Sequence, residues 1–315
     1  MSSPISYSLD GAIAVITVDN PPVNALSQAV REGLSNAVTR FEGDSKAKAA
    51  VIVGAGRTFF AGADIKEFGK PLAEPGLPGV VNQIEACSKP VIAALHGTAL
   101  GGGFEVALGC HYRVAVASAK VGLPEVSLGI LPGAGGTQRT PRLAGVEAAA
   151  GLITSGRHVG AQEALELGLI DEVSNEADPT TAGVAFAGLI IGNDLGPRPT
   201  RDLNTKLEEA RAHEGLFDGL RAAAEKKARG QLSPLVCLDA IEAAVTAKDF
   251  DAGLSEERRL FDKLMASDQR EALIHAFFGE RAVGKVPELE TGKPREVSNV
   301  GVIGGGTMGS GISIA

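Results

Sequence analysis

Two glutamates in apolar, glycine-rich surroundings are the side chains of this sequence best suited to chemistry. Glu105 follows three consecutive glycines in the stretch ALGGGFEVALG, residues 99–109. Each glycine costs a helix roughly 0.8–1 kcal/mol relative to alanine, and a carboxylate on a buried apolar face needs a reason to be there. We therefore expect the glycines to let the backbone approach a ligand closely, and Glu105 to act on that ligand.

The same glycines predict a site for an oxygen that gains negative charge. A helix that begins there directs backbone N–H groups and the positive end of its dipole toward one point. The stretch AGAD, residues 61–64, supplies a second turn of small residues with a free N–H group. Donors fixed in this way stabilise an acyl oxygen whose α-carbon is attacked or deprotonated, and loss of one donor typically lowers the rate by about 10²–10³.

A second acid, Glu125, lies in the stretch VGLPEVSLGILPGAGG, residues 121–136. Pro124 fixes the backbone before it, and glycines close the loop that follows. Two carboxyls at one pocket permit general acid–base catalysis, and unequal surroundings let one stay protonated while the other ionises. The alternative is that both are surface carboxylates, which their apolar, glycine- and proline-bounded surroundings argue against.

Other residues near these stretches are expected to have packing roles. His96 and His111 flank the glycine helix and are expected to pack at strand ends. The stretch GAGGTQR, residues 133–139, is expected to shape the wall near Glu125 rather than to bind phosphate.

The elements that must position these residues alternate between strand and helix. Two β-rich runs flank the turn dipeptide Asp10-Gly11 and predict a hairpin. Apolar residues at three- to four-residue spacing predict a helix up to about Phe41. Further strands are expected within 49–56, 90–97 and 111–119. This order predicts an α/β fold, in which ligands bind beyond the carboxyl ends of strands, and both AGAD and LGGGFE follow a strand.

The 315 residues divide into three expected parts. Residues 1–195 form the core that carries the two glutamates. Residues 196–290, which open on the proline-rich stretch GPRPTRD, form a helical segment and linker. Residues 291–315 begin a dinucleotide-binding domain.

This last part carries the glycine fingerprint of dinucleotide-binding folds. Gly304, Gly306 and Gly309 follow an apolar run that contains Val300 and Val302, which predicts a strand and then the start of a helix. The acidic residue that binds the ribose lies about 20 residues further on in complete sites. We therefore expect an incomplete NAD site and interpret the chain as the amino-terminal fragment of a longer protein.

Composition excludes several classes of partner. The net charge of −8 argues against nucleic acid and anionic membranes. Three widely spaced cysteines predict neither a disulfide framework nor a zinc site, and we expect no metal. No signal peptide and no apolar run of ~18 residues is found. We expect a cytoplasmic protein, with a peroxisomal location open because such an address would lie at the true carboxyl terminus.

Three stretches, FFAGADIKEF, HGTALGGGFEVALGCHYRVA and VGLPEVSLGILPGAGGTQRTPRLAG, resemble the signature blocks of the enoyl-CoA hydratase/isomerase (crotonase) superfamily. The match covers about residues 5–190. With its helical segment and final glycines, the chain resembles the amino-terminal half of bifunctional β-oxidation enzymes, in which a 3-hydroxyacyl-CoA dehydrogenase half follows. The implied fold is a crotonase-like spiral of ββα units, then a helical segment and a truncated first strand of a Rossmann domain.

The resemblance also implies roles for individual residues. Ala63 and Gly102 would donate the two N–H groups to the thioester oxygen. Glu105 would act mainly as the base toward water, and Glu125 would protonate the α-carbon.

Further residues would contact the substrate in this resemblance. Asp64, Ile65 and Lys66 would lie along the adenine and pantetheine of CoA, with Lys66 a candidate phosphate contact, and Gly103 would also bind the substrate.

The resemblance implies hydration of 2-trans-enoyl-CoA to 3-hydroxyacyl-CoA, with Δ3–Δ2 isomerisation in the same pocket. This step needs no metal or redox cofactor, and NAD is expected only for the full-length protein. The alternatives are a crotonase-family acyl-CoA enzyme that is not a hydratase, a non-catalytic CoA-thioester binder, and a fragment of an NAD-linked oxidoreductase. We expect the dehydrogenase activity only from the dehydrogenase half. Monomer and homotrimer both remain open.

Overall fold

Two β-sheets organise the computed structural model, which describes residues 3–64, 67, 73–283, 292 and 295–314. Among these residues, the larger sheet has the strand order β1-β2-β3-β4-β6-β9, and only the β1–β2 pair is antiparallel. Its strands are β1 (Ile5–Asp10), β2 (Ile13–Val18), β3 (Ala49–Gly54), β4 (Val91–Leu95), β6 (Tyr112–Val116) and β9 (Glu172–Ser174). The smaller sheet has the order β5-β7-β8 and consists of β5 (Thr98–Leu100), β7 (Lys120–Gly122) and β8 (His158–Gly160). The hairpin and the three later strands expected from the sequence are confirmed.

Both faces of the larger sheet are covered, which explains why β2, β3 and β4 contain no charged residue. Successive residues of β3 alternate between two cores: Ile52 belongs to the main core and Val51 to a smaller one. The smaller core is closed by α7 (Pro179–Gly192), where a Cβ at Gly183 would lie 2.6 Å from Val51 Cγ1. The main core is closed by α1 (Gln28–Gly43), α2 (Leu77–Glu85) and α3 (Gly102–Gly109).

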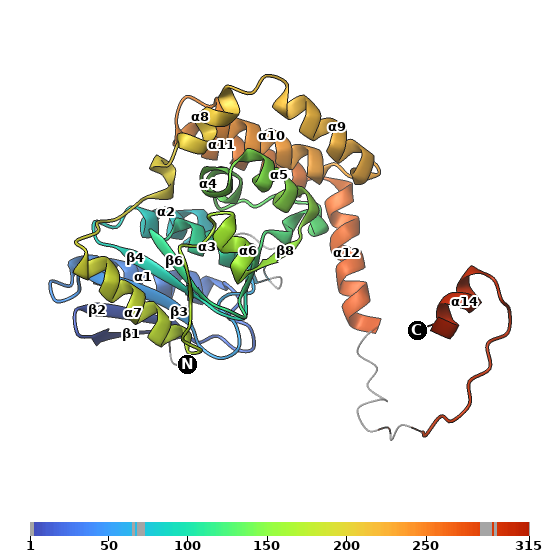
Figure 1. The fold of residues 1–315 in the computed structure, drawn as a ribbon, viewed down its shortest axis with the longest axis horizontal. Coiled ribbons are helices and arrows are strands. Elements are labelled where there is room, and N and C mark those ends of the chain that lie inside the picture. Colours follow the sequence, from blue (N-terminus) through green and yellow to red (C-terminus); the bar gives the residue numbers. More distant parts are fainter. Residues whose placement is uncertain (1–2, 65–66, 68–72, 284–291, 293–294, 315) are drawn as a thin grey trace. The chain divides into compact units, whose positions relative to one another are not determined.

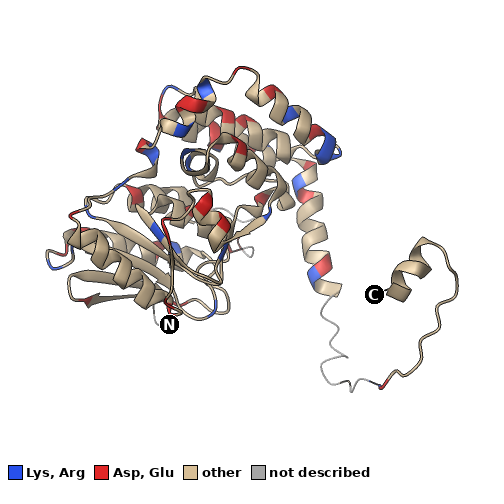
Figure 2. Ribbon diagram, in the orientation of Figure 1, with Lys and Arg blue, Asp and Glu red and all other residues tan. Residues whose placement is uncertain are grey.

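The remaining helices of the first compact unit begin after β7, and most of them pack together at one end of this unit (Figure 1). They are η2 (Pro124–Leu128), α4 (Gly136–Ala144), α5 (Val146–Ser155), α6 (Ala161–Glu166), η3 (Thr200–Asp202), α8 (Thr205–Arg211), α9 (Leu216–Ala228), α10 (Ser233–Thr246) and α11 (Phe250–Met265). Within this group, α10 is largely buried and contacts α4, α5, α9 and α11. The helical segment expected after the core is confirmed. Figure 2 shows acidic and basic residues interspersed along these helices rather than separated by sign.

The chain separates into two compact units, Met1–Ile274 and His275–Ala315, with α12 (Asp268–Val283) running across their boundary. None of the described helices combines the length and apolar composition that crossing a bilayer requires.

The prediction of a strand before the glycine fingerprint is wrong. Residues 295–306 form no strand, whereas α14 (Thr307–Ile314) provides the expected helix start. A strand needs a hydrogen-bonding neighbour, and the described residues of the second unit provide none. Gly304 has a φ of +105°, and a Cβ at Gly309 would overlap its carbonyl oxygen, so the turn closes tightly onto the helix.

The glycines at the start of α3 allow close packing against other parts of the protein. A Cβ at Gly103 would overlap the Phe60 carbonyl oxygen, and one at Gly102 would lie 2.6 Å from Leu77 Cδ2. All residues of α3 are buried. The cost of glycine in a helix is therefore offset by a packing distance that no other residue permits.

We expect Gly103→Ala to lower the free energy of unfolding by about 1–3 kcal/mol, because the added methyl meets backbone that cannot rotate away. The matched control is Gly151→Ala in α5, where nothing lies within 4 Å of an added Cβ and alanine should stabilise the helix by up to ~1 kcal/mol. Denaturant unfolding of both variants measures the difference. Equal stabilities would contradict this account of the glycines.

Candidate active site

Glu105 lies on the first turn of α3, and its carboxyl group is held by the loop that leads into α4. Its Oε1 atom accepts hydrogen bonds from the N–H groups of Ala134 (2.7 Å) and Gly136 (2.8 Å). The residue is only 3% exposed. Burial raises the pKa of Glu105 to about 7, while the two N–H donors and then the charge of Arg139 act to lower it. A carboxyl group with this pKa exchanges its proton near neutral pH.

Glu125 lies in η2 and approaches the first glycine of the turn before α3. A Cβ at Gly101 would lie 2.9 Å from Glu125 Oε1, and Gly101 has a φ of +53°, so glycine is required there. The Glu125 Oε2 atom is withdrawn from solvent and has no hydrogen-bond partner among the described residues. Burial, followed by the charges of Glu105 and Glu257, raises the pKa of Glu125 well above its usual value. These effects favour the protonated form of this carboxyl, which can donate a proton.

The backbone N–H groups of Ala63 and Gly102 are neighbours. A Cβ at Gly102 would lie 3.7 Å from the Ala63 nitrogen. The bridge between Leu26 and Ala63 uses the Gly62 carbonyl, which accepts from the Leu26 N–H group at 2.9 Å. In this parallel pattern the N–H group of Ala63 faces away from Leu26. Gly102 begins α3, so its N–H group has no acceptor within the helix.

The residues expected along the CoA moiety are only partly described. Asp64 is half-buried, whereas Ile65 and Lys66 lie outside the described residues. Gly103 is buried against the Phe60 carbonyl.

A third buried carboxyl, Glu257 on α11, reaches the same loop. Its Oε1 atom accepts from the N–H group of Gly135 (2.7 Å), and its Oε2 atom accepts from the N–H group (3.1 Å) and the hydroxyl of Thr137. Burial and then the charge of Glu105 raise the pKa of Glu257 to about 8. The stretch GAGGTQR was expected to shape the wall near Glu125. Its backbone N–H groups also donate hydrogen bonds to two carboxyls, those of Glu105 and Glu257.

Sequence reasoning missed Glu257, although a signal was present. The buried face of α11 consists of residues spaced three or four apart, namely Phe250, Gly253, Glu257, Leu260 and Leu264. A glutamate at one position of an otherwise apolar stripe indicates a buried carboxyl that needs partners.

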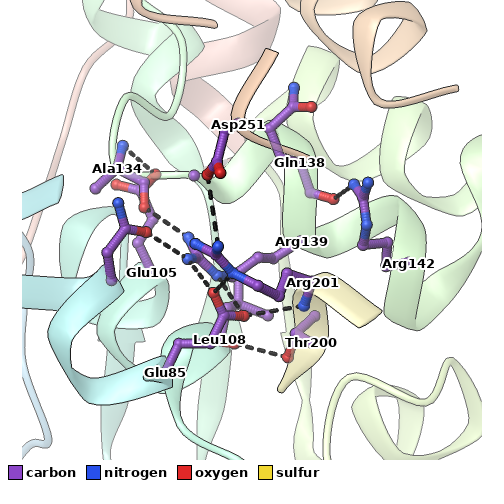
Figure 3. A network of polar contacts seen from close by, with 12 residues as sticks. Glu85, Glu105, Leu108, Ala134, Gln138, Arg139, Arg142, Thr200, Arg201 and Asp251 are labelled. Atoms are coloured by element: carbon purple, nitrogen blue, oxygen red, sulfur yellow. Dashed lines mark hydrogen bonds and ion pairs between the residues drawn. The ribbon is translucent and has the colours of Figure 1, made fainter. Parts of the chain in front are cut away.

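An ion-pair network lies beside Glu105 (Figure 3). Glu85 receives two hydrogen bonds from Arg139, at 3.1 and 2.7 Å, and one from Arg201 Nε at 3.0 Å. Burial acts to raise the pKa of Glu85, but Arg139 and then Arg201 lower it below its usual value. Arg139 also donates to the carbonyl of Ala134, at 3.1 Å, and so ties this network to the loop that holds Glu105.

The two histidines have packing roles, as expected. His111 is buried, with Nδ1 accepting from the Val91 N–H group at 3.0 Å and Nε2 lying 3.1 Å from the Glu85 carbonyl. His96 Nε2 lies 3.2 Å from the Gly56 carbonyl. Burial lowers the pKa of both rings.

Of the glycines of the dinucleotide fingerprint, which belong to the second unit, Gly304 and Gly306 are exposed and Gly309 is half-buried. Among the described residues, no group of His, Cys, Asp and Glu side chains has the arrangement of a metal site.

The geometry brings Glu105, Glu125 and the N–H groups of Ala63 and Gly102 to the start of one short helix. The pKa of Glu105 is raised to about 7, and the surroundings of Glu125 favour its protonated form, so the pair is suited to accept a proton at one atom and donate a proton at another. The N–H groups of Ala63 and Gly102 are suited to stabilise negative charge on an oxygen after one proton transfer and before the other.

Comparison with known proteins gives relatives along nearly the whole chain. A sequence profile of the enoyl-CoA hydratase/isomerase family matches residues 8–189. The peroxisomal bifunctional enzyme of Danio rerio is 46% identical over 309 residues, which cover 96% of this chain and 42% of that protein. The human peroxisomal bifunctional enzyme is 44% identical over 317 residues, which cover 98% and 43%. The chain thus spans less than half the length of these relatives.

Solved structures agree with the sequence matches. The carnitinyl-CoA hydratase from Mycobacterium avium is similar, with a TM-score of 0.65 and 29% identity over 89% of this chain and 97% of that chain. Because the family profile covers more than half of the sequence and this neighbour shares the fold, the chain belongs to the enoyl-CoA hydratase/isomerase family.

Proposed function

We propose that this chain hydrates 2-trans-enoyl-CoA to 3-hydroxyacyl-CoA in fatty-acid β-oxidation. The observation that carries the proposal is the placement of two carboxyls, Glu105 and Glu125, at the start of α3 beside the neighbouring N–H groups of Ala63 and Gly102. Burial raises the pKa of both carboxyls. Family membership and relatives named as bifunctional enzymes support it.

The proposed reaction starts with Glu105 ionised and Glu125 protonated. The thioester oxygen accepts from the N–H groups of Ala63 and Gly102. Glu105 removes a proton from water as the oxygen of that water bonds to C3, and the electrons of the double bond move toward the thioester. The Glu125 proton then bonds to C2. Water has been added across the double bond, and proton exchange between the two carboxyls restores the starting state.

The same two acids support Δ3–Δ2 isomerisation, in which a proton leaves one carbon of the acyl chain and another is delivered two carbons away. We propose that NAD has no role in hydration and is used only by a longer protein with a dehydrogenase half. The peroxisomal names of the relatives support a peroxisomal location, and a cytoplasmic location remains a sequence-based expectation.

Glu125→Gln should lower kcat for hydration of crotonyl-CoA by about 10²–10⁴, because an amide cannot deliver the proton to C2. Loss of the ultraviolet absorbance of crotonyl-CoA measures the rate. The matched control is Glu163→Gln, a half-exposed glutamate paired with Arg157 on the surface, which should keep the wild-type rate. A wild-type rate in Glu125→Gln would count against the assignment, and thioester binding without turnover in the wild type would favour the non-catalytic alternative.

The value of kcat/KM should fall as the pH is lowered below about 7, because Glu105 must be ionised to accept a proton and its pKa is raised to about 7. Below this pH the rate should fall about tenfold per unit. A profile that stays flat down to pH 5 would exclude Glu105 as the base.

Addition of NAD to the hydration assay should leave the rate unchanged, because the proposed reaction moves protons and water but no hydride. The comparison is made at saturating crotonyl-CoA with and without NAD. A rate that requires NAD would favour the oxidoreductase alternative.

A further inference from the structure

The loop of residues 134–137, which leads into α4, is held by carboxyl groups from two helices, α3 and α11. The four consecutive N–H groups of residues 134–137 alternate in direction: the first and third donate to Glu105, and the second and fourth to Glu257. Glu105 lies on α3 and Glu257 on α11, two helices that are far apart in the sequence. The loop position is thus set jointly by the two carboxyls.

Close packing leaves this loop little freedom to move. Gly135 has a φ of +94°, and a Cβ there would overlap the guanidinium of Arg139. A Cβ at Gly136 would lie 2.8 Å from Glu105 Oε1, and one at Gly133 would lie 2.5 Å from the Phe261 ring on α11. Glycine is needed at these positions because carboxyls and rings approach the backbone from two sides.

The charged groups that face Glu257 come from every element packed around it. From α3 it meets Glu105, and from α4 the guanidinium of Arg139. In turn its charge raises the pKa of Glu125 in η2 and that of the Cys237 thiol on α10. Glu257 is therefore part of the same electrostatic cluster as the two acids of the proposed reaction, although its own oxygens are occupied by loop donors.

We propose that Glu257 is a positioning residue for Glu105: by accepting from the N–H groups of Gly135 and Thr137, it fixes the adjacent donors, Ala134 and Gly136, that orient the Glu105 carboxyl. This inference rests on the proposed hydratase function for its kinetic consequences, but not for the loop geometry. Positioning errors of about 1 Å can cost on the order of 10² in rate, which sets the scale of the expected effect.

Two variants of Glu257 separate its contributions. Glu257→Met keeps the length of the side chain but removes both acceptor atoms, and Glu257→Gln keeps one. With loosened donors, Glu105 loses hydrogen bonds that lower its pKa, so the acid side of the kcat/KM profile should move to higher pH. The lost charge acts in the opposite direction but weakly, because the pKa of Glu257, about 8, leaves it mostly neutral where Glu105 titrates.

For crotonyl-CoA we expect kcat per folded enzyme to fall about 100-fold in Glu257→Met and about 10-fold in Glu257→Gln, with KM within about twofold of wild type. Glu256→Gln, one residue away on the exposed side of α11, is the matched control and should match wild type. A second test leaves Glu257 intact. Thr137→Val removes the hydroxyl that donates to Glu257 and should lower kcat, whereas Thr137→Ser keeps a hydroxyl and should retain the wild-type rate.

Thermal unfolding first establishes that each variant is folded. If Glu257→Met lowers stability but leaves kcat per folded enzyme and the pH profile unchanged, Glu257 is only structural and the proposal is overturned. If the wild-type chain does not hydrate enoyl-CoA, the proposed function fails separately, and amide hydrogen exchange of residues 134–137 decides the loop geometry. Faster exchange in Glu257→Met than in Glu256→Gln supports the proposal, and equal exchange overturns it.

Discussion

The candidate site depends on burying the Glu105 carboxyl with backbone N–H donors in place of an ion-pair partner. Glu85 and Glu105 are almost equally buried, at 1% and 3% exposure, yet their pKa values move in opposite directions. Glu85 is paired with two arginines and stays ionised, whereas Glu105 has only N–H donors and titrates near neutrality. Arg139 pairs with Glu85, and its charge is the smallest of the effects that act on the pKa of Glu105. Ion pairing therefore separates a structural carboxylate from a proton-exchanging one.

The hydrogen-bond donors at the candidate site come mainly from the backbone. The donors at Ala63 and Gly102, and those of residues 134–137, are all main-chain N–H groups that small residues allow to come close. Such donors need no side-chain ordering when charge develops, which is the condition for efficient stabilisation of an oxyanion. The glycine at 101 serves a different purpose, since it makes room for the carboxyl of Glu125.

The helical end of the molecule contributes to the site as well as to the core. α11 is distant in sequence from the glycine stretch, but Glu257 on its buried face binds the loop beside Glu105. Gly253, one turn earlier, brings α11 against Gln138 of α4. Residues after 195 therefore share in holding the loop on which Glu105 depends.

The α/β class, the hairpin, the strands of the larger sheet that precede the two turns of small residues, and the two glutamates as candidates were predictable from the sequence, because they follow from local periodicity, turn residues and short motifs. The sequence did not reveal that Gly101 makes room for Glu125, or that Glu257 belongs to the cluster, because these depend on atoms brought together from distant segments. The strand expected at 300–303 is absent for the same reason, since a strand exists only through its hydrogen-bonded neighbour. Protonation was likewise decided by tertiary structure: burial and neighbouring charge, which set the pKa of each carboxyl, are properties of the packed interior.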